Sequence, residues 1–299
     1  MRKHLFSILF LLIAAAIWWA SISSTVRNPV VDNDKPVMVT SGYVPYTIIK
    51  QLVADNVNVL MLLPPNAEPH AFEPTPGALI MLKHANAFIY MSDELEPWAA
   101  DLSKVTDEKA PVVKLADMIP DSTDPHVWMN PHNAKFLAAA IVKILVQIDP
   151  VHEPIYEANL AKFDAEIDAL EQAFSTALAH CQSREVVHVG HLAFKNLTDT
   201  YNLQLTALAG TSHDGEHSAK KLAALTKEIK DKQITTIFTE DTLSPRLAQA
   251  VAQETGSRIL PLYPIEHISK QDFHNNITYA ELMHRNLQSL TEGLQCQVS

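Results

Sequence analysis

The chain has 299 residues, 47% of them hydrophobic and 19% charged, which is enough material for one large core or two medium ones. We expect two domains. Lysine and arginine number 23 against 34 aspartate and glutamate residues, giving a formal net charge of −11 without a basic cluster, so we expect no nucleic-acid partner.

The beginning of the chain is typical of an export signal. Arg2 and Lys3 precede an apolar run over residues 5–22 that only two serines interrupt. An uncleaved membrane anchor is the alternative, because this run approaches the length of a spanning helix. No cysteine lies near residue 20, where a lipid-attachment signal would place one. We therefore expect a cleaved signal peptide over residues 1–24 and a periplasmic protein that is not a lipoprotein.

Residues 37–150 are predicted to form the first lobe, in which short apolar or β-branched runs alternate with amphipathic stretches. The predicted strands lie at 37–41, 57–63, 87–91 and 111–115, and helical spacing covers 45–55, 75–84 and 95–104. This alternation predicts a parallel sheet whose strands are separated by helices. Ligand sites of such sheets lie at the carboxyl ends of the strands.

The middle of the chain is predicted to be helical. One helix covers residues 132–148 and ends before Pro150, and a second stretch without an internal helix breaker covers residues 153–180. At 1.5 Å per residue, a helix of that length measures roughly 40 Å. We expect it to run along both lobes as a rigid spine that restricts hinge motion.

Residues 183–299 are predicted to form a second lobe that repeats the architecture of the first. Its strands are expected at 185–189, 203–208, 234–239 and 258–263, and its helices at 191–201, 217–231, 244–255 and 272–295. The predicted fold class is therefore α/β, with two lobes that each contain a mainly parallel sheet flanked by helices. The chain has 7 glycines and no glycine-rich phosphate loop, so nucleotide binding is not indicated.

Three of the 14 histidines follow predicted strands directly. His70 comes after the strand at 57–63, His126 after the strand at 111–115 and His191 after the strand at 185–189. The carboxyl ends of strands in two lobes can converge on one cleft. Neutral imidazole binds Zn²⁺, Cu²⁺ and Fe²⁺ well, so the three histidines predict a transition-metal site. The alternative is that each is an exposed loop residue.

The two cysteines lie far apart in the sequence. An exported protein meets an oxidising environment, in which Cys181 and Cys296 can form a disulfide. We expect this bond to tie the last helix to the start of the second lobe. The alternative is two buried free thiols.

Several local motifs resemble one known family in both order and spacing. They are LPPNAEPHAFEPTPGAL, EPWAADL, DPHVWMNPHNAK, YEANLAKF, HLAF and IFTEDTLSP. From about Val37 to the C-terminus the chain resembles the metal-binding class of ABC-transporter substrate-binding proteins, the zinc and manganese receptors. The resemblance implies two α/β lobes joined by a rigid helix, with one metal held by His70, His126 and His191. It also implies a monomer that is not an enzyme and delivers its metal to an ABC permease in the inner membrane.

The metal implied by the resemblance is Zn²⁺ rather than Mn²⁺. The HLAF motif around His191 resembles the zinc receptors, whereas manganese receptors carry glutamate at this position. Imidazole is a softer ligand than carboxylate and favours zinc on physical grounds.

The fourth ligand stays open. The family's usual aspartate corresponds to Tyr263, and a phenol is a poor ligand at neutral pH because it loses its proton near pH 10. The candidates are water, Glu240, Glu68, Tyr263, Glu266 and His267. We favour water or Glu240. Glu240 also resembles the family's glutamate that orients a ligand histidine, the alternative being a carboxylate at a helix N-terminus.

Other residues near these motifs are weaker candidates for a role in metal binding. His213 and His217 could form a weak capture site, or simply an exposed loop and helix start. His188 lies on a strand three residues before His191, and alternation along the strand predicts that it points to the opposite sheet face in a structural role. Trp98 and Trp128 are expected to pack beside the metal site.

Two other functions fit a site with three histidines. A zinc-dependent hydrolase would use an open coordination position, but the chain has no H-E-x-x-H or H-x-H-x-D pattern. An adhesin or a metal chaperone would share the site chemistry and differ only in its partner.

Overall fold

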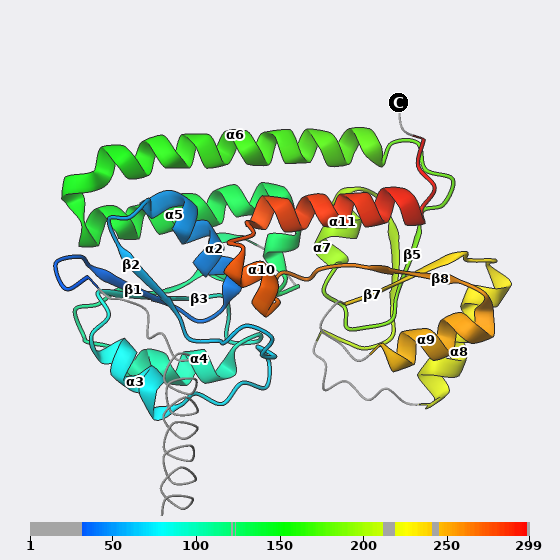
Figure 1. Cartoon of the computed structure of the whole chain (residues 1–299), viewed down its shortest axis with the longest axis horizontal. Coiled ribbons are helices and arrows are strands. Elements are labelled where there is room, and N and C mark those ends of the chain that lie inside the picture. The colour runs from blue at the N-terminus through cyan, green and yellow to red at the C-terminus, as the bar shows by residue number, and fades with distance from the viewer. Residues whose placement is uncertain (1–31, 121, 123, 212–218, 241–244, 298–299) are drawn as a thin grey trace, which may run out of the picture. The chain divides into compact units, whose positions relative to one another are not determined.

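The computed structural model describes residues 32–120, 122, 124–211, 219–240 and 245–297. The chain divides into two compact units, residues 1–34 and residues 35–299, and all the elements below belong to the second unit (Figure 1). The predicted signal peptide, residues 1–24, lies outside the described residues. Within the described residues, no helix has both the length and the apolar character that crossing a bilayer requires.

The first lobe is built on a four-stranded parallel sheet in the order β2-β1-β3-β4. The strands are β1 (Val37–Thr40), β2 (Asn58–Met61), β3 (Ala87–Tyr90) and β4 (Val112–Lys114), and the helices between them are α2 (Tyr43–Val53), α3 (Pro76–Lys83) and α4 (Pro97–Leu102). Successive side chains of β1 face opposite layers: Met38 packs in the main core with α2, while Val39 packs in a smaller core with α3 and α4. Burial on both faces explains the continuous apolar runs of these strands.

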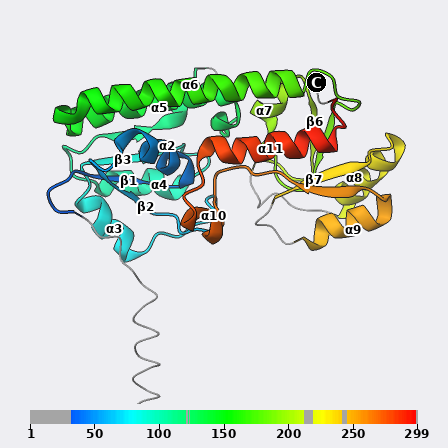
Figure 2. The same ribbon diagram turned by 45° about the horizontal axis from the view of Figure 1, so that its top comes forward.

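The predicted central helices are confirmed as α5 (Pro131–Ile148) and α6 (Glu153–Ala177). Asn130 caps α5 by accepting a hydrogen bond from the backbone N–H of His132, and Pro131 occupies the first turn, where no amide donor is needed. α6 spans both lobes along one side (Figures 1 and 2). Its Asn159 donates to the carbonyl of Leu52 in the first lobe, and its Phe174 stacks on Tyr201 in the second lobe.

The second lobe repeats the architecture with the strand order β6-β5-β7-β8, again parallel. The strands are β5 (Glu185–His188), β6 (Gln204–Ala207), β7 (Thr236–Thr239) and β8 (Arg258–Pro261). The helices are α7 (Lys195–Thr200), α8 (Ala219–Asp231), α9 (Arg246–Thr255), α10 (Lys270–His274) and α11 (Tyr279–Gly293).

The helix predicted over 272–295 is two helices, α10 and α11. Asn276 has a φ of 53°, which ends α10, and Thr278 with Glu281 forms a capping box that begins α11. The helix predicted over 191–201 begins only at Lys195, because residues 191–194 are irregular, with a bend at Leu192. Both departures arise from local turn chemistry that apolar periodicity does not reveal.

The last part of the chain ties the two lobes together. α11 packs against α6 and α2, and the hydroxyl of Tyr279 donates to the backbone carbonyl of Trp128 at 2.6 Å. The predicted disulfide between Cys181 and Cys296 is confirmed, and it joins the segments that follow α6 and α11. The contact between Tyr279 and Trp128 links the last helix to the first lobe, while the disulfide fixes the end of this helix to the end of α6.

Candidate metal centre

The structure brings the three predicted histidines together. His70 lies in the loop after β2, His126 directly before the 3₁₀ helix Val127–Met129, and His191 in the turn after β5. His126 and His191 are fully buried, and the side chain of His70 is 6% exposed. The Nε2 atoms of His126 and His191 are 3.3 Å apart. Two lobes thus contribute imidazoles to one buried point.

A carboxylate completes this cluster, and it belongs to Glu266. One ligand atom from each of His70, His126, His191 and Glu266 lies within 4.8 Å of the others. The Glu266 carboxylate is 3.2 Å from Nε2 of His191 and 3.5 Å from Nε2 of His70 and of His126. Glu266, one of the candidates for the fourth ligand, is therefore the carboxylate in this group, and Glu240 is not part of it. Glu68, Tyr263 and His267 are also outside the group of four.

The segment after β8 explains why Glu266 takes this place. Ile265 has a φ of 67°, a conformation that costs a non-glycine residue about 1–3 kcal/mol, and it turns the next side chain towards the histidines. Contacts of Tyr263 fix the backbone of this segment. Its backbone N–H donates to the side-chain oxygen of Asn286, and its ring lies against Arg285. Trp128 adds a hydrogen bond from its indole N–H to the carbonyl of Pro264. Tyr263 itself is not part of the group of four.

Two carboxylates orient two of the histidines. Nδ1 of His191 is 2.7 Å from Oε1 of Glu240, and Nδ1 of His126 is 2.9 Å from Oδ1 of Asp124. A proton held on Nδ1 leaves the Nε2 lone pair facing the centre of the cluster, as a metal ligand requires. The orienting role expected for Glu240 is thus matched by its position. The sequence analysis did not single out Asp124, although the D-P-H motif places it two residues before His126.

Strand alternation predicted that His188 points away from this site, but its side chain lies beside it. Its Nδ1 is 3.0 Å from the carbonyl oxygen of His191, and its Nε2 is 3.8 Å from the Glu240 carboxylate. The chain turns at Gly190, where an added Cβ would lie 2.5 Å from the His188 ring and 2.6 Å from Glu240. The tight turn after β5, rather than the alternation within it, sets which groups His188 touches.

The charges of the cluster are strongly coupled. Burial by itself lowers the pKa of His191, but the carboxylates of Glu266 and Glu240 outweigh it and raise this pKa to about 11. Burial likewise disfavours charge on Glu266 and on His126. The histidines nevertheless hold the pKa of Glu266 well below 4.5, and Asp124 with Glu266 raises the pKa of His126. In the metal-free protein, an imidazolium therefore sits between two carboxylates.

The two tryptophans lie beside the site as expected. The Trp128 ring is buried with its centroid 5.4 Å from that of His126. The Trp98 indole N–H donates to the carbonyl of Pro69, the residue before His70. Both rings fix the backbone that carries a ligand and exclude water from its surroundings. His213 and His217, the suggested capture site, lie outside the described residues.

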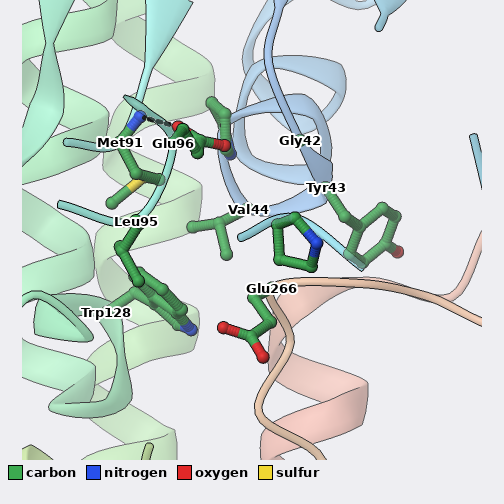
Figure 3. A pocket seen from close by; sticks show the side chains of 10 residues that line it. Gly42, Tyr43, Val44, Met91, Leu95, Glu96, Trp128 and Glu266 are labelled. Carbon is green, nitrogen blue, oxygen red and sulfur yellow. Dashed lines mark hydrogen bonds between the residues drawn. The ribbon is translucent and has the colours of Figure 1, made fainter. Parts of the chain in front are cut away.

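A small pocket behind Glu266 contains a second buried carboxyl group, Glu96. Glu96 lies on one side of this pocket and Glu266 on another (Figure 3). Glu96 accepts a hydrogen bond from the N–H of Met91 at 2.7 Å. Burial raises the pKa of Glu96 to about 7, and hydrogen bonds from Ser41 and Met91 offset this only in part.

Replacing this carboxyl group should change how stability depends on pH. An acid whose pKa is raised from 4.5 to about 7 by folding costs the folded state free energy as the pH rises through that interval. For Glu96→Gln, the free energy of unfolding relative to the unchanged protein should therefore improve by about 3 kcal/mol between pH 4.5 and pH 8. Denaturant unfolding of both metal-free proteins at the two pH values measures this. A difference that does not vary with pH would contradict it.

Comparison with known proteins places this site in context. A family model described as "Zinc-uptake complex component A periplasmic" matches residues 38–293. The high-affinity zinc uptake system protein ZnuA of Bacillus subtilis is 30% identical over 306 residues, which cover 95% of this chain and 94% of that protein. The crystal structure of the Zn(II)-bound ZnuA-like domain of Streptococcus pneumoniae AdcA has a TM-score of 0.76 and 31% identity, over 87% of this chain and 99% of that one. None of these similarities supports the hydrolase alternative.

The expectation that the protein is not a lipoprotein is wrong. A relative from Streptococcus pneumoniae is named zinc-binding lipoprotein AdcA, with 29% identity over 85% of this chain and 55% of that protein. The name says of that relative that it is a lipoprotein, and this is the finding against the expectation. The expectation rested on the lack of a cysteine near residue 20, and one missing feature is not enough to exclude a membrane anchor.

The predicted two-lobed fold with parallel sheets and the resemblance seen in the motifs are both confirmed. With its pattern matched from residue 38 to residue 293, the chain belongs to the family of periplasmic zinc-uptake complex component A proteins.

Proposed function

We propose that the protein captures one Zn²⁺ ion with His70, His126, His191 and Glu266 and delivers it to an ABC permease. The observation that carries this proposal is the convergence of these four ligand atoms within 4.8 Å at a buried point. Three imidazoles and one carboxylate supply the four donors that tetrahedral Zn²⁺ takes. Mn²⁺ favours more oxygen donors and is the less suitable occupant.

A role in binding rather than catalysis follows from the number of protein ligands. Catalytic zinc sites keep a position open for water or substrate, whereas structural sites are closed by protein side chains. Here four side chains can fill the coordination shell, so we propose that the protein is not an enzyme. His126 and His191 are fully buried, which slows access of solvent to a bound ion.

We further propose that residues 37–150 and 183–299 act as two lobes around the helix at 153–180, as the sequence predicts. The first supplies His70 and His126, and the second supplies His191 and Glu266. The site is complete within one chain, which supports a monomer as the working form.

Titration of metal-free protein with Zn²⁺ tests this function. We expect one ion per chain with a dissociation constant far below the micromolar range, measured by competition with a chelator of known affinity. Zinc at a thousandfold excess over that constant should raise the free energy of unfolding by about 4 kcal/mol. His191→Ala should abolish tight binding, whereas His132→Ala, which removes an exposed histidine on α5, should leave it intact. Binding no tighter than micromolar in the unchanged protein would refute the proposal.

A further inference from the structure

Asn196, in the first turn of α7, reaches across from the second lobe to the first. Its side-chain amide donates to Oδ2 of Asp124 at 3.1 Å and to the backbone carbonyl of His126 at 3.0 Å. The side chain is half-buried, and both acceptors lie in the loop that carries a ligand histidine. Because both contacted groups are oxygen acceptors, only the NH₂ end of the amide can face them.

This contact completes the hydrogen bonding of a buried carboxylate. Oδ1 of Asp124 accepts from the backbone N–H of His126 at 3.1 Å and lies 2.9 Å from Nδ1 of its ring. Oδ2 accepts from Asn196, so each carboxylate oxygen has a fixed partner. A carboxylate held at both oxygens cannot rotate freely about its Cβ–Cγ bond. It therefore holds the imidazole of His126 in one orientation.

The two oriented histidines differ in where their support comes from. His191 and the Glu240 that orients it both belong to the second lobe. His126 belongs to the first lobe, but the carboxylate that orients it is held in part by Asn196 of the second lobe. The geometry of the His126 ligand thus depends on contact between the lobes, and that of His191 does not.

We propose that Asn196 is a positioning residue that couples contact between the lobes to the orientation of His126, and so controls how fast zinc is released. This inference rests on the proposed function of the four-residue site. While α7 touches the His126 loop, the Nε2 lone pair is aimed at the ion. When the lobes move apart, Asp124 loses one of its donors and the imidazole loses its fixed orientation. Separation of the lobes thereby loosens one ligand without any change at the ion itself.

Zinc release into an excess of a chromogenic chelator, followed by stopped flow, tests the coupling. Asn196→Ala should release zinc roughly 10-fold faster, in the range seen when partners of metal ligands are removed. Asn196→Asp, which keeps the size but sets a carboxylate against Asp124, should do so at least as strongly. Asn159→Ala is the matched control: it too removes a half-buried amide that donates to a backbone carbonyl of another element, Leu52, but away from the metal site. It should leave the rate unchanged.

Double substitutions distinguish an effect of Asn196 through Asp124 from a general effect on the packing of α7. If Asn196 acts through Asp124, Asn196→Ala should add little to the rate of Asp124→Asn. Asn196→Ala should still increase the zinc release rate of the Glu240→Gln protein, because Glu240→Gln acts on His191 instead. Equal effects in both backgrounds, or an unchanged release rate in Asn196→Ala, would overturn the inference while leaving zinc binding by the unchanged protein in place. Failure of the unchanged protein to bind zinc would instead overturn the proposed function.

Discussion

Glu266→Gln should lower the affinity for Zn²⁺ by at least about 100-fold, beyond the effect of losing a group that only orients a ligand. The variant exchanges an anionic oxygen donor for a neutral amide at the point where four ligand atoms meet. One effect works in the opposite direction. Without the Glu266 carboxylate, the pKa of His191 falls, so less free energy is needed to remove the proton with which zinc competes. We expect the lost ligand to outweigh this gain.

Glu68→Gln is the matched control for this experiment. Glu68 is also a glutamate near a ligand, and its carboxylate accepts a hydrogen bond from the backbone N–H of His70 at 3.2 Å. It is not one of the four converging residues, so its substitution should change the affinity far less. Chelator competition on the metal-free variants gives both dissociation constants. A Glu266→Gln protein that binds zinc as tightly as the Glu68→Gln protein would remove Glu266 from the ligand set.

Zinc affinity should rise steeply with pH. In the metal-free protein the pKa of His191 is raised to about 11, so this imidazole carries a proton throughout the neutral range. Zinc binds the neutral form and must displace that proton, which strengthens binding by about tenfold per pH unit for each proton released. The pKa of Glu266 lies well below 4.5, so its carboxylate contributes no change over this interval. Dissociation constants at pH 6, 7 and 8 measure the slope.

Calorimetry in buffers of different ionisation enthalpy counts the released protons directly. We expect at least one per zinc ion at pH 7. Stability of the metal-free protein should change with pH in the opposite direction. A histidine whose pKa is raised by folding contributes stability that is complete below about pH 6.5, and this stability is lost as the pH rises towards 11. A zinc affinity that does not vary with pH would contradict the charge state inferred for His191.

The order of strands and helices could be predicted because it depends on local patterns. Strands such as Val37–Thr40 and Ala87–Tyr90 are buried on both faces and therefore read as short apolar runs. The helix Glu153–Ala177 contains no residue that would break it after its first turn. Boundaries set by turn chemistry, such as the break at Asn276, were less evident.

The place of the histidines could also be predicted, since parallel strands present their carboxyl ends at one edge. That rule identifies His70, His126 and His191 from their positions after strands. It leaves Glu266 as one of several candidates, because a carboxylate near a strand end becomes a ligand only if its side chain meets the histidines in space. The rule does not identify Asp124 either. A carboxylate orients a histidine only if it lies within hydrogen-bonding distance of the ring nitrogen, and the sequence does not show that distance.

The sequence by itself determined the fold class, the three histidines and the pairing of Cys181 with Cys296, because periodicity, residue chemistry and compartment all act locally or pairwise. Only the tertiary structure decided the fourth member of the site, the partners of each imidazole and the reach of Asn196 from one lobe to the other. Those features require side chains far apart in the chain to meet within hydrogen-bonding distance. Such meetings follow from the packing of α6 and α11 against both lobes, and no local pattern in the sequence encodes that packing.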